Sequence, residues 1–238
     1  MPTLKPEPSL TKLLARKRRL GALAGASAAR LCELRAWQAA RLERTYCDLR
    51  REPRHAAAVE FFLSDLYGAR DFSDRDRDLQ RALRYLQRAL PSAALGVLAQ
   101  AIELEVLSAE LDQAMVGVLT AGAITPASYA AAYRAVGQGV ARARQIELIM
   151  SIGATLDRIV RHAWIALALR VAHAPAHAAG FGALQDFLER GFAAFRRMRG
   201  SARFLQTIRE RETRSMQIIL AGGDAPWGAA PERAETVS

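Results

Sequence analysis

Apolar residues recur at helical spacing along most of the chain. The clearest case lies between residues 183 and 199, where apolar side chains return every three or four positions and mark one face of a helix. No stretch alternates apolar and polar residues between hairpin turns, as a half-buried strand does. The sequence therefore predicts an all-α fold, an irregular multi-helix bundle of about eight helices. The expected helices span residues 28–50, 55–67, 73–89, 91–120, 126–136, 140–172, 183–199 and 201–220.

Residues that favour helix ends support several of these boundaries. Thr125 and Pro126 are typical of an N-cap followed by proline at the first helical position. Gly68 and Gly200 follow apolar helical stretches, where glycine commonly ends a helix. Pro175 lacks a backbone N–H and clashes with the preceding turn, so we expect the helix at 140–172 to break near it.

Charge and composition divide the chain into a body and two tails. Residues 1–54 contain 13 Lys/Arg and 5 Asp/Glu, whereas residues 55–238 contain 21 and 19, so most of the net charge of +10 lies near the N-terminus. We expect residues 1–27 to form a basic, flexible extension, 28–221 a single helical domain and 222–238 a disordered tail. A basic extension attracts nucleic acid, acidic proteins or anionic membranes. We favour a solvated tail and expect no nucleic-acid partner.

The cysteine count and the hydropathy pattern favour a cytoplasmic protein. Cys32 and Cys47 are too few for a disulfide framework or a cysteine zinc site, so we expect reduced thiols. No run of about 18 apolar residues is present, so no membrane span is expected. Arginine outnumbers lysine 31 to 3, a bias that we interpret as the product of a G+C-rich bacterial genome.

The familiar catalytic and metal-binding motifs are absent from the sequence. It contains no phosphate-binding glycine loop, no nucleophile elbow and no zinc-protease helix. Glu52 and His55 have the spacing of a di-iron ligand pair, but a proline lies between them. His173 and His177 have metal-like spacing, yet Pro175 is expected to disrupt the helix that would align the two rings. We therefore expect no metal site, and the sequence identifies no cofactor.

Five acidic residues are weak candidates for a functional site: Asp65, Asp71, Asp76, Asp157 and Glu212. The first three belong to a segment in which aspartates alternate with arginines. The last two fall inside apolar helical stripes, where a carboxylate is costly unless it is paired or protonated. Such groups are candidates for a perturbed pKa and for function. The alternative, which we favour, is a structural ion pair with an arginine such as Arg75, Arg77 or Arg158 for each acid.

The segment at residues 61–76, FFLSDLYGARDFSDRD, resembles the hallmark of an uncharacterised family of bacterial helical proteins that share the pattern FFLxDLYGxxDFxxRD. Residues 107–112, 187–198 and 204–212 resemble the same family, and the resemblance covers roughly residues 38–220. The family is a domain of unknown function, so the resemblance implies no activity, cofactor or site residue.

Three functional hypotheses are compatible with the sequence. The leading one is a non-catalytic, cytoplasmic helical protein that binds a protein, a second copy of itself or a small ligand. The second is an enzyme or metal-binding protein whose site gathers the five acids. The third is nucleic-acid binding through the basic extension. Convergence of three acids beside a cavity favours the second hypothesis, whereas an arginine beside each acid favours a structural role.

Overall fold

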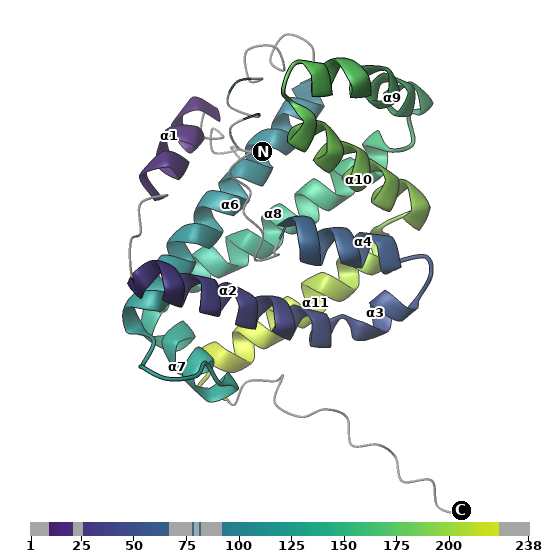
Figure 1. Ribbon diagram of the computed structural model, residues 1–238. Helices are drawn as coiled ribbons and strands as arrows, with labels where there is room; N and C mark the ends of the chain where they lie inside the picture. Colours follow the sequence, from purple (N-terminus) through teal and green to yellow (C-terminus); the bar gives the residue numbers. More distant parts are fainter. Residues whose placement is uncertain (1–9, 21–25, 67–77, 79–80, 82–91, 224–238) are drawn as a thin grey trace, which may run out of the picture.

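A computed structural model describes residues 10–20, 26–66, 78, 81 and 92–223 of the chain (Figure 1). Within these ranges it has ten α-helices, one π-helical turn and no strand, which confirms the predicted all-α class. The elements are α1 (Leu10–Leu20), α2 (Ala26–Thr45), α3 (Cys47–Arg51), α4 (Ala56–Phe61), η1 (Phe62–Leu66), α6 (Ser92–Val118), α7 (Pro126–Val136), α8 (Gly139–Ile159), α9 (Ala163–Ala178), α10 (Gly182–Met198) and α11 (Ala202–Leu220).

Helix α6 runs through the centre of the molecule. It packs against α1, α2, α7 and α8, so it needs apolar residues on more than one of its faces. The largest core cluster joins α2, α3, α4, α8, α10 and α11, and a second cluster lies where α7 meets α2, α6 and α11. No helix in the described part of the chain has the length and hydropathy needed to cross a membrane.

The start of α7 follows from local sequence alone. The Thr125 hydroxyl accepts a hydrogen bond from the backbone N–H of Ser128, and the Ser128 hydroxyl accepts one from the N–H of Thr125. Pro126 occupies the first turn, where its missing N–H costs no hydrogen bond. The predicted N-cap is therefore confirmed.

The expected long helix at 140–172 is wrong in one respect, because two helices occupy this region. Helix α8 ends at Ile159 and α9 begins at Ala163, whereas Pro175 lies inside α9 and does not end it. Pro175 is close to the C-terminal end, where it removes one hydrogen bond, and its own carbonyl still accepts from the N–H of Ala179. The break between α8 and α9, at residues 160–162, contains neither glycine nor proline. After this break the chain turns back, and α9 packs against α10.

Residues 10–20 lie within the predicted flexible extension, but they form a packed helix. Leu13 and Leu14 of α1 are buried in a small cluster with Ile102 and Val106 of α6. At the edge of this contact Arg16 pairs with Glu110, and Lys17 pairs with Glu105, both of which lie on α6. The domain boundary at residue 27 stays a prediction. Helix α1, which lies before this boundary, packs against α6 of the helical body.

Three further expectations lie outside the described residues. They are the glycine stop at Gly68, most of the helix expected at 73–89, and the C-terminal tail beyond residue 223.

Candidate metal centre

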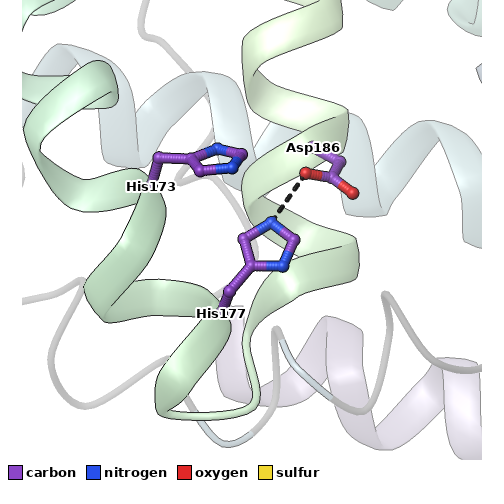
Figure 2. A group of neighbouring side chains, drawn as sticks. All are labelled: His173, His177 and Asp186. Carbon is purple, nitrogen blue, oxygen red and sulfur yellow. Dashed lines mark hydrogen bonds and ion pairs between the residues drawn. The ribbon is translucent and has the colours of Figure 1, made fainter.

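Two histidines and an aspartate converge where α9 and α10 form a helical hairpin. His173 and His177 lie one turn apart on α9, and Asp186 faces them from α10 (Figure 2). One ligand atom from each of the three residues lies within 4.8 Å of the other two. The hairpin therefore presents two imidazoles and a carboxylate to the same small volume.

The expectation that Pro175 misaligns the two histidines is wrong. Because α9 continues to Ala178, the residues four apart stay on one face, and their ring centroids are 4.5 Å apart. The spacing of the histidines therefore does place the two rings on one face of α9. Asp186, which comes from the next helix, had no comparable signal in the sequence.

Each histidine already has a carboxylate partner. Nε2 of His177 lies 2.9 Å from Oδ1 of Asp186. Nδ1 of His173 lies 3.0 Å from Oε1 of Glu189, one turn further along α10. When Nδ1 of His173 donates its proton to Glu189, its Nε2 carries the lone pair and is free to bind a metal.

Buried Gln185 holds Glu189 in place. Its side-chain amide donates to Oε1 of Glu189 and to the carbonyl of Leu169, both at 2.8 Å. The hydrogen bonds from Gln185 and from His173 lower the pKa of the Glu189 carboxyl, against the opposing effect of burial. Glu189 is thus held as an anion that orients His173, as carboxylates behind metal-binding histidines do.

The absence of a side chain at residue 182 makes room for His177. A Cβ on Gly182 would lie 2.7 Å from Nδ1 of His177, which is closer than real contacts allow. A larger residue there would displace the imidazole from its place beside Asp186. The tight approach of the two helices at the hairpin depends on this glycine.

The Asp/Arg-rich segment reaches this hairpin through the side chains of Asp78 and Arg81. Oδ2 of buried Asp78 lies 3.4 Å from the backbone N of Leu184 in the first turn of α10, which is a helix-capping contact from outside the helix. Arg81 donates to Oδ1 of Asp78 at 2.7 Å and to the carbonyl of Gly180 at 2.5 Å. These contacts fix the turn that joins the two histidines to Asp186.

The five acids proposed from the sequence do not form a common site in the described part of the chain. Asp71 and Asp76 lie outside it, as does the side chain of Asp65. Asp157 accepts from the N–H of Ser201 at 3.0 Å and from Arg161 at 2.7 Å. Glu212 accepts from Arg41 at 2.6 Å and from the Tyr46 hydroxyl at 2.7 Å. Both acids have an arginine partner, although neither partner was among the three that the sequence suggested.

A further acid, Asp112, is buried in the C-terminal part of α6. It accepts hydrogen bonds from Gln38 at 3.0 Å and from Arg35 at 3.3 Å. Burial nevertheless raises the pKa of the Asp112 carboxyl above its ordinary value, against the lowering effects of Gln38, Arg35 and Arg142. The folded state therefore holds this proton more tightly than the unfolded chain does.

This linkage predicts a pH-dependent stability that Asp112→Asn should remove. The contribution of the protonated group is complete below the unfolded pKa, near pH 4, and is lost as pH rises through the raised folded pKa. Between these two pH values the free energy of unfolding of the wild type should fall relative to that of Asp112→Asn. The expected fall is about 1.4 kcal/mol for each unit by which the folded pKa of Asp112 exceeds its unfolded pKa. Urea unfolding of both proteins from pH 4 to pH 8 measures this difference. A pH-independent difference would contradict the raised pKa.

The fold and the site thus define an all-α protein with a histidine–carboxylate cluster on a helical hairpin. Residues 17–226 match the model of a family described as "Domain of unknown function (DUF8198)", and the chain belongs to that family. The resemblance to an uncharacterised helical family is thereby confirmed. Neither the curated proteins nor the solved structures contain a match to the chain.

Proposed function

We propose that the α9–α10 hairpin binds a divalent transition-metal ion of the zinc class. The observation that supports this proposal is the convergence of His173, His177 and Asp186 within 4.8 Å. Ligand atoms around a tetrahedral zinc ion lie about 3.3 Å apart, given metal–ligand bonds of about 2.0–2.1 Å. Small rotations of exposed side chains bring the three groups to that spacing. This proposal departs from the expectation of no metal site, and it is closest to the metal-binding hypothesis, although its ligands are not the five acids named there.

The choice of ligands favours zinc, cobalt or nickel over magnesium and calcium. Imidazole nitrogen is a borderline-soft donor, and the harder ions prefer oxygen ligands throughout. Three protein ligands leave the fourth position of a tetrahedral ion for water or for a ligand. The half-exposed setting of His173 and His177 leaves that position open to solvent.

Without a metal, His173 lies beside Glu189 and His177 beside Asp186, and such contacts contribute little on a surface. With it, α9 and α10 are crosslinked across a short turn. The two alternatives predict different results for His177→Ala. The variant should lose a bound metal if the hairpin holds one, and only a weak surface contact if it does not.

Replacing His177 by alanine should abolish stoichiometric metal binding. We expect wild-type protein, stripped with chelator and carrying no affinity tag, to bind one Zn²⁺ or Co²⁺ per chain at pH 7.5. His177→Ala should weaken binding by about 100-fold or more, because a direct ligand matters at least as much as the groups behind it. Isothermal titration calorimetry measures the affinity, and the visible spectrum of bound Co²⁺ reports tetrahedral geometry.

His162→Ala is the matched control for this experiment. His162 is also exposed and lies next to α9, but at its opposite end, and its side chain makes no capping hydrogen bond. The control should bind metal like the wild type. Equal losses of metal affinity in both variants, or a wild type that binds no stoichiometric metal, would contradict the metal site. The histidine–carboxylate pairs would then have no role in metal binding.

A further inference from the structure

A cavity of about 410 Å³ opens at the other end of α9, where the end of α8 meets the end of α10. Its wall includes three arginines, Arg161, Arg196 and Arg199, and a single acid, Asp157. The volume is within the range of small-molecule pockets, which is about 300–1,000 Å³. The cavity shares no residue with the histidine cluster.

The charges in the wall do not cancel. Both oxygens of Asp157 are engaged, one by the Ser201 N–H and one by Arg161, so this acid offsets one arginine. Arg196 and Arg199 form no ion pair with any residue in the described ranges. The wall therefore carries an excess of about two positive charges, which matches a phosphate monoester dianion.

The backbone around the cavity contributes both signs of potential, because the C-terminal ends of α8 and α10 and the N-terminal end of α9 meet there. The carbonyls at the end of α10 would repel an anion, but Arg54 covers them, donating to Met198 O at 2.6 Å and to Gly200 O at 3.3 Å. The start of α9, the positive end of its dipole, contributes Ala163 to the wall. The wall thus combines arginine side chains with one helix N-terminus, and Arg54 binds two of the carbonyls at the end of α10.

One side of the cavity is apolar. Phe195 and Val160 are buried core residues, and both line it. Arg199, which also contributes to the wall, is the C-cap of α10 and has a positive φ of 53°, the left-handed conformation in which many helices end. The combination of an apolar wall and guanidinium groups fits a ligand with an organic part and a charged end.

We propose that this cavity binds a phosphate monoester. Arg196 and Arg199 contact the phosphate oxygens, because the planar guanidinium matches their geometry. The organic part of the ligand lies against Phe195 and Val160. The proposal stands on the cavity and its charges, and it does not depend on metal binding at the hairpin.

Calorimetric titration of the full chain with phenyl phosphate, at constant ionic strength, tests the proposal. We expect saturable binding at one site, weakened about tenfold by Arg196→Gln and by Arg199→Gly, since a charge-assisted hydrogen bond is removed in each. Glycine suits the positive φ at residue 199, so the second variant loses the guanidinium without straining the fold. Arg197→Gln is the matched control, because Arg197 is exposed on the same turn and lies outside the wall.

Two comparison ligands separate the parts of the proposal. Benzoate has the same ring with a single negative charge and should bind at least tenfold more weakly. Inorganic phosphate has the charge without the ring and should also bind more weakly than phenyl phosphate. Equal affinity for benzoate would overturn the role of the dianion, and equal affinity for inorganic phosphate would overturn the role of the apolar wall. An equal loss in Arg197→Gln would show diffuse surface attraction and overturn the site.

Discussion

Replacing Glu212 by alanine should lower the free energy of unfolding by about 3–5 kcal/mol. Its carboxylate lies beside the Arg41 guanidinium, and their side chains are only 18% and 10% exposed. Burial by itself would lower the pKa of Arg41, but the neighbouring Glu212 raises it above its ordinary value. Arg41 therefore stays charged, and removal of its partner leaves a buried cation with one hydrogen-bond acceptor fewer. Urea unfolding measures the loss.

Two further variants determine whether Glu212 has a purely structural role. Glu210→Ala is the control on the same helix, where the exposed Glu210 only accepts from Gln206, and it should change stability by less than about 0.5 kcal/mol. The double variant Arg41→Met/Glu212→Leu removes both charges and should recover most of the loss. If Glu212→Ala is as stable as the wild type, the ion pair does not stabilise the fold, and the carboxylate returns as a functional candidate.

Replacing Leu13 by alanine should cost about 2–4 kcal/mol, the range for a leucine deleted from a packed core. Leu13 is only 2% exposed and packs with Leu14 against α6, so its truncation leaves a cavity in the α1 contact. The measured loss cannot exceed the free energy with which α1 docks onto the body. A larger destabilisation would simply let α1 detach while the rest of the domain stays folded. Urea unfolding and limited tryptic cleavage at Arg16 and Lys17 report the global and the local effect.

Lys12→Ala is the matched control for α1. Lys12 is adjacent in sequence and exposed, so its truncation should leave both unfolding and cleavage unchanged. If Leu13→Ala behaves like this control, residues 10–20 contribute nothing to the body. The flexible extension predicted from their charge would then describe them better than a docked helix.

Helix α9 connects the two proposed sites. Its first residue, Ala163, lines the cavity with the arginines, and His173 and His177 near its other end belong to the proposed metal centre with Asp186. The helix has no buried residue and packs along α10 at the edge of the molecule (Figure 1). The proposed metal site therefore lies on the α9–α10 hairpin, whereas the cavity lies between this hairpin and the end of α8.

The sequence by itself determined the helical class and several helix ends. Apolar periodicity depends only on the pitch of a helix, and the capping of α7 depends only on residues within one turn. The same local reasoning identified Asp157 and Glu212 as acids that need a partner, because each interrupts an apolar stripe. It also noted the metal-like spacing of His173 and His177 but discounted it on the evidence of Pro175.

Only the tertiary structure decided which distant groups meet. Arg41, which comes 171 positions before Glu212, became its partner because α2 and α11 contribute to the same core. The break between α8 and α9 carries no glycine or proline, and it follows from packing of α9 on α10, which also brings Asp186 to the two histidines. A ligand set drawn from two helices depends on how those helices pack, and no local pattern records that.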